Sequence, residues 1–436
     1  MMSALAALYP DHLATLTTAY DHVLANHALD ALIISAGSAA LKNRFDDQYR
    51  PLATTPAFAH WLPLPEPDAV LVARAGRRPL LIRVVSDDYW ETPPACESDH
   101  FWSGFEVIEV RTATDAAAHL PGGRVAVIAS DALPFTAPGP VNPPEVVAAI
   151  HAVRTRKTPY EVGCLLEATR RAMRGHRTAA ARFADDAPGE LALHLAYLSA
   201  SGQDDAETPY KNIVARGTHA AVLHHVHYAK LAPPAGPDSL LVDAGASCLG
   251  YGSDITRTWV RGDGAAATLF AALVAGVERL QQELCGAIAP GLEYEALHDR
   301  SHLLLGELLV ELGVGRGTAD ELVARGVTRA LFPHGLGHSL GIQVHDVGMR
   351  LRPPRANNPF LRNTSVIEAG QVFTIEPGCY FIDGLLAPLR GDQRAALLDW
   401  TTVDALRPFG GVRIEDDVVV TAGGMRNLTR EVWGEA

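Results

Sequence analysis

Two neighbouring stretches decide the fold: Ser239-Leu240-Leu241-Val242-Asp243-Ala244-Gly245 and, after a short turn, Gly252-Ser253-Asp254-Ile255-Thr256-Arg257-Thr258. Each has the pattern of a buried or alternating strand, and each contains one aspartate. Such an aspartate must be compensated, because an unpaired carboxylate is costly to remove from water. A hairpin would bring Asp243 and Asp254 together, where two ionised carboxylates repel one another unless a cation lies between them. An ordinary arrangement in which both aspartates stabilise turns explains the pair equally well at this point.

A glycine-rich segment, Phe332 to Asp346, carries His334, His338 and His345. The separation of the first two histidines is that of a helical zinc motif, but Gly335 stands where that motif requires glutamate. The glycines predict extended or loop backbone, which a ligand can approach closely. One histidine here would be structural, whereas three within twelve residues indicate function.

Two later strands also carry acidic groups. Alternation over Gln371 to Gly378 places Glu376 at the end of a buried strand. In Gly410 to Val418 the same period places Arg413 and Glu415 side by side on one face. Taken alone, this last segment is explained by an internal Arg–Glu ion pair.

The second part of the chain therefore offers four carboxylates and at least one imidazole. Hard oxygen donors with one or two nitrogens suit a binuclear site for Mn²⁺, Co²⁺, Fe²⁺ or Zn²⁺. In such sites the ions lie roughly 3.5–4 Å apart, with a bridging hydroxide as the nucleophile. The pattern predicts metal-assisted hydrolysis.

Composition limits the remaining possibilities. The chain has 436 residues, of which 48% are apolar, so we expect two or three domains. The 37 Lys and Arg against 50 Asp and Glu give a net charge of −13, which disfavours nucleic acid as a partner. Five scattered cysteines without a Cys-x-x-Cys pair argue against a disulfide framework or thiolate zinc site. We expect no signal peptide and no membrane span, and a reducing cytoplasm fits best.

Hydrophobic periodicity divides the chain near residue 157. Before it, the pattern predicts an α/β domain, residues 1–157, with a helix around 13–24, strands at 31–35, 69–73, 79–85 and 124–130, and a helix at 145–157. Thr158-Pro159 starts a long helix, because proline suits a first helical turn. Residues 158–436 then alternate helices at roughly 190–201, 265–287 and 293–312 with strands at 240–246, 254–260, 371–376 and 411–420.

Taken in order, these motifs resemble those of the "pita-bread" metallopeptidases, and the bacterial Xaa-Pro dipeptidases, or prolidases, most closely. The resemblance implies an α/β creatinase-like N-terminal domain followed by an α+β pita-bread catalytic domain. Its strongest stretches are Pro209 to Val214, Leu223 to His227, Val242 to Gly245, Ser253 to Thr258, His334 to Asp346, Phe373 to Tyr380 and Phe409 to Asp416.

The resemblance implies a set of metal ligands. These would be Asp243, Asp254, His338, Glu376 and Glu415, with Asp254 and Glu415 bridging two divalent ions. Mn²⁺ is the favoured ion, with Co²⁺, Zn²⁺ and Fe²⁺ as alternatives. The reaction would be hydrolysis of Xaa-Pro dipeptides through a metal-bridging hydroxide.

Other residues acquire roles by the same resemblance. Glu376 would move the proton from the nucleophile to the leaving proline nitrogen. His224 and His345 would bind substrate and steady the tetrahedral intermediate, and His334 would contact substrate. Tyr210 is expected among the substrate-binding residues, where it would hydrogen-bond a metal ligand.

The substrate's own chemistry completes the expectation. Arg362 and Arg413 would lie near the carboxylate of the dipeptide, and a fixed guanidinium explains a requirement for a free C-terminus. An Xaa-Pro amide has no N–H, so the site can do without an acceptor there. The family pattern implies a homodimer, in which Asp46 or Asp47 would reach the partner's substrate amine; a solvated acidic loop explains these aspartates equally well.

Several alternatives stay open. The same metal site would serve for organophosphates or other esters, and an aminopeptidase P-like enzyme would act on longer Xaa-Pro peptides. A scaffold protein that keeps the fold without metals is disfavoured by the presence of all five ligand types. The doublet His224-His225 and the insertion Pro233 to Pro237 lengthen the loop before Asp243 relative to the family pattern, so the shape of the pocket wall is expected to differ. Tyr89-Trp90-Glu91 also departs from the pattern, so the substrate preference is expected to differ from that of close relatives.

Overall fold

The computed structural model describes residues 2–85, 99–130, 133–234 and 236–434. Tyr89-Trp90-Glu91 and Cys96 lie outside these ranges. The chain forms two compact units, Met1–Cys164 and Leu165–Ala436. Helix α5 (Pro159–Asp185) begins in the first unit and ends in the second, so a domain division near residue 157 remains our proposal.

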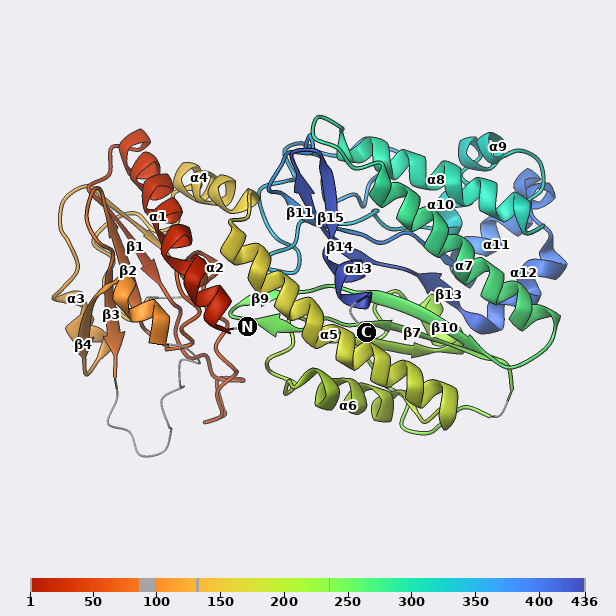
Figure 1. Cartoon of the computed structure of the whole chain (residues 1–436), viewed down its shortest axis with the longest axis horizontal. Helices are drawn as coiled ribbons and strands as arrows, with labels where there is room; N and C mark the ends of the chain where they lie inside the picture. Colours follow the sequence, from red (N-terminus) through yellow and green to blue (C-terminus); the bar gives the residue numbers. More distant parts are fainter. Residues whose placement is uncertain (1, 86–98, 131–132, 235, 435–436) are drawn as a thin grey trace. The chain divides into compact units, whose positions relative to one another are not determined.

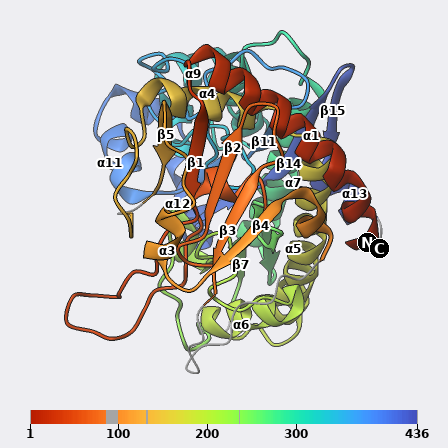
Figure 2. The same cartoon turned by 90° about the vertical axis from the view of Figure 1, so that its left-hand side faces the viewer.

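The first unit is built on a five-stranded mixed sheet (Figures 1 and 2). Its strand order is β4 (Glu106–Val110), β3 (Leu80–Val84), β2 (Val70–Arg74), β1 (Ala31–Ser35) and β5 (Val125–Ile128). The helices of this unit before α5 are α1 (Met2–Asn26), α2 (Pro56–Ala59), α3 (Ala113–Ala117) and α4 (Pro144–Thr155), with a 3-10 turn η1 (Asp99–Gly104). The apolar runs predicted for β1, β2, β3 and β5 are confirmed, and β2 and β3 pair antiparallel as the predicted hairpin.

One half of the second unit packs α5 and α6 (Glu190–Ser201) on a three-stranded antiparallel sheet. The strand order is β10 (Thr256–Arg261), β7 (Asp238–Asp243) and β6 (Ile213–Arg216). Met173 and Phe183 of α5 and Tyr197 of α6 share a buried cluster with Leu240 and Val242 of β7. Burial of these side chains explains why β7 forms despite its terminal aspartate.

The other half packs α7 (Ala265–Gly286) and α8 (Tyr294–Glu311) on a second antiparallel sheet (Figure 1). Its strand order is β11 (Val372–Ile375), β14 (Asp416–Thr421) and β15 (Gly424–Asn427). The helices α5, α6, α7 and α8 are all confirmed at their predicted places.

Shorter elements complete the second unit. They are η2 (Gly217–Ala221), β8 (Ser247–Cys248), β9 (Tyr251–Gly252), α9 (Ala319–Ala324), α10 (Val327–Leu331), β12 (Gly378–Tyr380), α11 (Asp383–Gly391), η3 (Gln393–Leu397), α12 (Trp400–Leu406), η4 (Arg407–Phe409), β13 (Gly411–Arg413) and α13 (Leu428–Trp433).

The prediction of one continuous strand over 411–420 is wrong. The chain forms β13, which pairs with β12, and then β14, which pairs with β11. Between them, the backbone N–H of Glu415 donates to the carbonyl of Thr256 at 3.0 Å. The strand breaks because three different partners take its backbone groups in succession.

Alternation directs polar side chains to a shared face. Val412 and Ile414 belong to the core beneath α7 and α8, whereas Arg413 and Glu415 line a cavity. Asp243 ends β7 on the face opposite the helices and lines the same cavity. The period-two pattern thus buries apolar residues and collects charged ones in one place.

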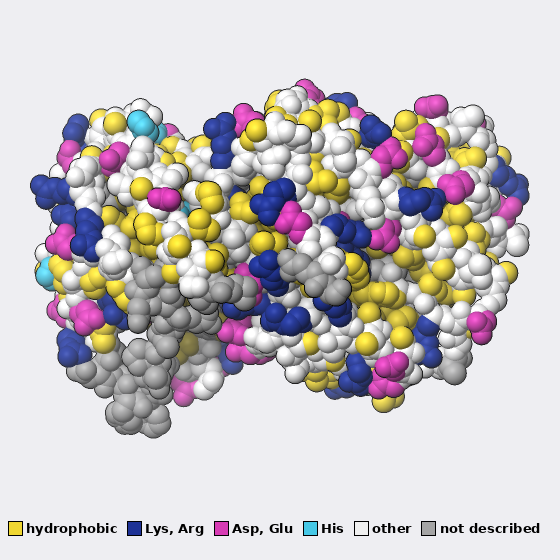
Figure 3. Space-filling model, viewed as in Figure 1, with side chains coloured by type: hydrophobic (Ala, Val, Ile, Leu, Met, Phe, Trp, Pro, Cys, Tyr) yellow, Lys and Arg dark blue, Asp and Glu magenta, His cyan; other side chains and the backbone are white. Residues whose placement is uncertain are grey.

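Arginines on α5 join this helix to the second unit. Figure 3 shows Lys and Arg side chains gathered where α5 crosses the visible face. Arg171 donates to the carbonyl of Ser247 at 3.1 Å, Arg174 to that of Ala200 at 3.3 Å and Arg177 to that of Trp433 at 3.1 Å. These arginines therefore have partners inside the chain.

Two exclusions drawn from the sequence can be compared with the structure. Cys285 and Cys379 are buried free thiols, and Cys164 and Cys248 are buried as well. Among the helices of the described residues, none is both long and apolar enough to cross a bilayer.

The glycine-rich segment runs along β11. Ser339 forms a bridge with Phe373, and the N–H of Thr374 donates to the carbonyl of His338 at 3.0 Å. A Cβ at Gly337 would lie 2.1 Å from the carbonyl oxygen of Thr374 and 2.4 Å from the hydroxyl of Tyr294. The sequence predicted that the glycines allow a ligand to approach the backbone. At Gly337 the space left by the missing side chain is instead occupied by strand β11 and Tyr294.

We predict that Gly337→Ala lowers the free energy of unfolding by about 1–3 kcal/mol, because the added methyl must displace backbone. Gly286→Ala is the matched control, since a Cβ there meets nothing within 4 Å. It should leave stability unchanged or raise it by up to about 1 kcal/mol. Denaturant unfolding of both variants measures this difference, and equal stabilities would contradict the close approach at β11.

Candidate metal centre

A single cavity of about 990 Å³ in the second unit receives the predicted site residues. Its lining includes Tyr210, His224, Asp243, Asp254, His334, His338, His345, Arg362, Glu376, Arg413 and Glu415. Sequence positions from 210 to 415 therefore converge on one place.

The hairpin of β7 and β10 places two aspartates on one hydroxyl. Thr256 of β10 lies opposite Asp243, so Asp254 follows the turn just before the paired strand. The hydroxyl of Tyr210 is 2.7 Å from Oδ1 of Asp243 and 2.5 Å from Oδ1 of Asp254. Since one hydroxyl carries one proton, it satisfies only one carboxylate at a time. The aspartates are not the simple turn-stabilising pair that the sequence had left open.

Asp254, His338 and Glu415 form the tightest group. Each offers a ligand atom, and these atoms all lie within 4.8 Å of one another. Nδ1 of His338 lies 3.1 Å from the carbonyl of Ser339, while Nε2 is 3.3 Å from Oδ2 of Asp254. A carbonyl acceptor fixes the proton on Nδ1, which leaves the lone pair of Nε2 for a metal ion. Glu376 adds its Oε1 at 3.7 Å from the same nitrogen.

Arg413 is held by a network on the inner side of the cavity. Its Nη2 donates to Oδ2 of Asp243 at 2.5 Å, its Nη1 to the hydroxyl of Tyr380 at 2.8 Å and its Nε to Oγ1 of Thr256 at 3.2 Å. Thr256 in turn donates to Oε2 of Glu415 at 2.6 Å. The ion pair of Arg413 is therefore with Asp243 on a distant strand, and the alternative of a local pair with Glu415 is wrong.

The site carries excess negative charge. Asp243, Asp254 and Glu415 are each at most 9% exposed, and Glu376 lies beside them. Burial, followed by repulsion from Asp243, raises the pKa of Asp254, and burial raises the pKa of Glu376 to about 7. Burial and the neighbouring carboxylates also raise the pKa of Glu415 well above its usual value. Such shifts are what closely placed carboxylates undergo when no cation separates them.

The fit to divalent cations follows from this charge. Arg413 supplies one positive charge, and His338 supplies at most one more. Burial lowers the pKa of His338, but its hydrogen bond to Asp254 and the charges of Asp254 and Glu376 together outweigh burial and raise the pKa. Carboxylate oxygens with one imidazole nitrogen are a donor set for Mn²⁺, Co²⁺, Fe²⁺ or Zn²⁺. Divalent ions would remove the repulsion that the protein alone leaves.

Three further histidines, His224, His334 and His345, line the cavity. His334 contacts the carbonyl of Gly335 through Nδ1 at 2.9 Å and the hydroxyl of Tyr380 through Nε2 at 2.8 Å. Its pKa is lowered to about 3, first by burial and then by Arg413. Burial, then His338, lowers the pKa of His345 to about 3, and its ring meets that of His338 edge-on at 4.4 Å. His224 lines the cavity from the loop after η2.

The outer part of the cavity is cationic. Arg362, Arg350 and Lys211 line it and are exposed to solvent. No hydrogen bond or ion pair joins Arg362 to any other described residue, in contrast to the fully engaged Arg413. Of the two predicted arginines, Arg362 is thus the one whose guanidinium faces the open cavity.

Sequence reasoning missed three supporting residues. Tyr380 joins His334 to Arg413, Thr256 joins Arg413 to Glu415, and the carboxylate of Asp417 accepts from the N–H of Asp254 at 3.1 Å. Asp417 is fully buried on β14, and its position directly before the apolar run Val418-Val419-Val420 was the available signal. The other two look like ordinary strand residues.

Comparison with protein families identifies the second unit. The family model described as "Metallopeptidase family M24" matches residues 163–422, well over half of the chain. The chain belongs to this family. A second model, "Xaa-Pro dipeptidase, N-terminal domain", matches residues 7–152. This M24 member is therefore a metal-dependent hydrolase of the Xaa-Pro dipeptidase group.

Individual relatives agree with this assignment over the whole chain. An Xaa-Pro dipeptidase of Marinobacter nauticus is 43% identical over 429 residues, covering 97% of this chain and 98% of the relative. One of Stenotrophomonas maltophilia is 41% identical over 442 residues, covering 99% and 98%.

Solved structures agree on the fold. Proline aminopeptidase P II from Yersinia pestis has a TM-score of 0.73 at 22% identity, covering 98% of this chain and 96% of that one. Aminopeptidase P from E. coli with the inhibitor Pro-Leu has a TM-score of 0.72 at 22% identity, covering 98% and 95%. An N-terminal α/β domain followed by a pita-bread catalytic domain is thus confirmed.

The raised pKa of Glu376 predicts a pH effect in the metal-free protein. Between its usual value of 4.5 and about 7, folded Glu376 holds a proton that the unfolded chain releases. Its contribution to stability is therefore present below pH 4.5 and is lost as the pH rises through 7. Relative to Glu376→Gln, chelated wild-type protein should lose on the order of 2 kcal/mol over this range.

Denaturant unfolding of both chelated proteins at pH 5, 6 and 7 measures this difference. Added divalent metal should reverse the order at pH 7, because only the wild-type glutamate is a full ligand. Parallel pH profiles for the two metal-free proteins would rule out the raised pKa.

Proposed function

We propose that the chain hydrolyses Xaa-Pro dipeptides at a centre that holds two divalent metal ions. The observation that carries the proposal is the convergence of three buried carboxylates, the half-buried Glu376 and one imidazole nitrogen on a cavity with a cationic outer wall. The curated relatives from Marinobacter nauticus and Stenotrophomonas maltophilia are both named Xaa-Pro dipeptidases, which supports this substrate class.

The ligands would be Asp243, Asp254, His338, Glu376 and Glu415. The proximity of Asp254 and Glu415 to one another and to His338 supports a bridging role for both carboxylates. When bound, the two ions would supply an ionised water as the nucleophile and polarise the amide carbonyl. Mn²⁺ is our first choice among ions that suit these ligands.

Glu376 would carry the proton. A carboxylate whose pKa lies near 7 in the metal-free site can accept a proton from the attacking water and return it. Its Oε2 lies 3.6 Å from Nδ1 of His334, so its second oxygen also faces the cavity. The proton would pass to the proline nitrogen, which has no hydrogen of its own and must gain one to leave.

Neutral imidazoles suit the developing oxyanion. The low pKa of His345 keeps it uncharged near neutral pH, so one ring nitrogen can donate a hydrogen bond. His224, which lines the same cavity, would donate a second. Donors placed where charge develops lower the barrier more than they strengthen substrate binding. His334 would contact the substrate beside them.

The substrate's carboxylate would bind at the outer wall. Arg362 faces the cavity without a partner among the described residues, whereas Arg413 is committed to Asp243, Tyr380 and Thr256. We therefore assign the carboxylate contact to Arg362 and give Arg413 the role of positioning Asp243. A requirement for the free carboxylate would restrict cleavage to dipeptides.

We also propose that two copies of the chain associate. Asp46 lies in an exposed loop between β1 and α2, which Figure 2 shows extending from the first unit, and its Oδ1 accepts from the N–H of Gln48 at 3.0 Å. Asp47 is exposed and Asp46 is half-buried, and either carboxylate would meet a substrate amine in a second copy. Sedimentation of the chain tests this association.

The deciding experiment is proline release from Xaa-Pro dipeptides by chelated protein before and after addition of Mn²⁺. We expect no release without metal and full recovery with it. Asp254→Asn and Glu415→Gln should each reduce kcat/KM by more than about 100-fold, because loss of a ligand costs more than loss of its outer partners. Glu311→Gln, on the exposed surface of α8, is the control.

The outcomes separate the alternatives. Turnover of a phosphotriester without proline release would favour an esterase, and release of the first residue from Xaa-Pro tripeptides at similar rates would favour an aminopeptidase. No turnover with any divalent metal by folded protein would favour a binding protein. Full activity and metal content in Asp254→Asn would refute the ligand assignment.

Arg362→Ala should raise KM for dipeptides about 10-fold, because a charge-assisted hydrogen bond to the substrate carboxylate is lost. Metal content should not change, since Arg362 contacts no proposed ligand. A dipeptide amide lacks the carboxylate, so its kinetics should be equal for wild type and variant. Unchanged KM for the free dipeptide would remove this role from Arg362.

A further inference from the structure

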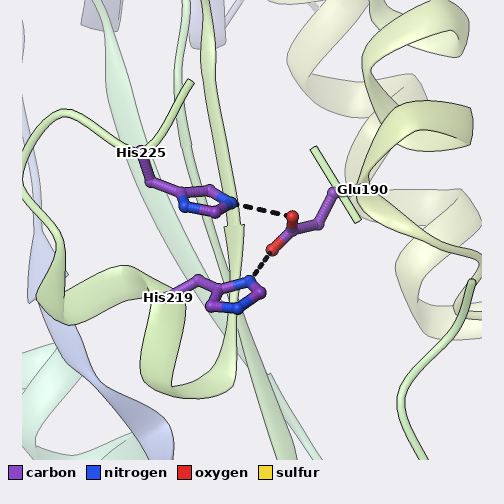
Figure 4. Close-up of side chains that lie close together, drawn as sticks. All are labelled: Glu190, His219 and His225. Atoms are coloured by element: carbon purple, nitrogen blue, oxygen red, sulfur yellow. Dashed lines mark hydrogen bonds and ion pairs between the residues drawn. The ribbon is translucent and has the colours of Figure 1, made fainter. Parts of the chain in front are cut away.

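A second cluster of metal-binding residue types lies outside the catalytic cavity. Glu190 stands in the first turn of α6, His219 in η2 and His225 on the loop that follows (Figure 4). Nδ1 of His219 lies 2.6 Å from Oε1 of Glu190, and Nε2 of His225 lies 2.8 Å from Oε2. None of these three residues lines the cavity.

We propose that Glu190, His219 and His225 form a further metal site, specific for ions of the zinc class. Their ligand atoms all lie within 4.8 Å of one another, as do those of Asp254, His338 and Glu415. Two imidazoles with one carboxylate are a common three-residue set for Zn²⁺, completed by water. Imidazole nitrogen also favours Zn²⁺, Ni²⁺ and Cu²⁺ over Mg²⁺ and Ca²⁺.

The surroundings of Glu190 favour the ionised form of its carboxylate. Burial raises the pKa of Glu190, but donation from the N–H groups of Ala229 and Arg216 and from the two imidazoles outweighs it, so the pKa is lowered. The two amides lie 2.7 and 2.9 Å from the carboxylate oxygens. They hold Glu190 in place whether or not an ion is bound, so the site is largely preformed.

The imidazoles of His219 and His225 are stacked, and they differ in solvent exposure. Their ring centroids are 4.4 Å apart with an angle of 23° between the planes, and Figure 4 shows both rings pointing at the carboxylate. The side chain of Glu190 is 1% exposed, that of His225 10% and that of His219 46%. One side of the cluster is thus open, which gives an ion a route of entry and a position for water.

An ion at this site would fasten the loop that carries His224. The loop lies between Arg216 and Ala229, whose backbone amides both donate to Glu190, and His224 is the immediate neighbour of His225. The ion would link α6 to two points on this loop. The site therefore offers a means for a second metal to influence a residue of the catalytic cavity.

Equilibrium dialysis of the full chain against buffered micromolar Zn²⁺ tests the proposal. Wild type should bind one more equivalent of zinc than His219→Asn and than His225→Asn. His227→Asn, an exposed histidine on the same loop but outside the cluster, should bind as much as wild type. Circular dichroism of the variants checks that they are folded, and His219 is exposed enough that its replacement should not prevent folding.

The comparison counts a difference of one equivalent, so it does not depend on how many ions the catalytic centre holds. Anomalous diffraction at the zinc edge should place a peak beside Glu190. Equal zinc content in all four proteins, or a loss in His227→Asn as well, would overturn the proposal and leave a hydrogen-bonded clamp. Failure of the catalytic centre would instead appear in wild type as absent proline release.

Discussion

Mutual repulsion of buried carboxylates is the constraint on which the second unit depends. Asp243 ends β7, and Asp254, Glu376 and Glu415 lie just outside the strands β10, β11 and β14. The neighbouring carboxylates raise the pKa values of Asp254 and Glu415. Apolar burial beneath two helix pairs holds these strands together against that repulsion. Arg413 offsets part of it by bonding Asp243, and the remainder is what makes the site a receptor for divalent ions.

The parts of this design that depend on local pattern could be predicted. Alternation along β7 and β13 places Asp243 and Arg413 on the face opposite their apolar neighbours Val242 and Val412. The glycines of the histidine segment predicted its extended or loop backbone. The long helices follow from their periodicity in the same way, since their apolar faces cover the sheets.

The parts that depend on distant pairing could not. Arg413 has a glutamate two residues away with suitable charge, yet its partner is Asp243, which a sequence pattern does not connect to it. The break between β13 and β14 arises because β12, β10 and β11 each pair with a different part of this segment in succession. Glu190 reads as an ordinary helix-start acid, and only folding brings His219 and His225 to it.

The pairing of the glycine-rich segment with β11 makes release of the proposed metal ligand His338 a different event from unfolding of the domain. His338 is held by backbone bonds along one edge of a strand, and its neighbours Gly337 and Ser339 add little apolar burial of their own. Local opening of such an edge requires less free energy than unfolding of the cores beneath α7 and α8. Opening of this edge would release the imidazole while the sheets stay intact, so exchange of a bound metal and unfolding of the domain would have different barriers.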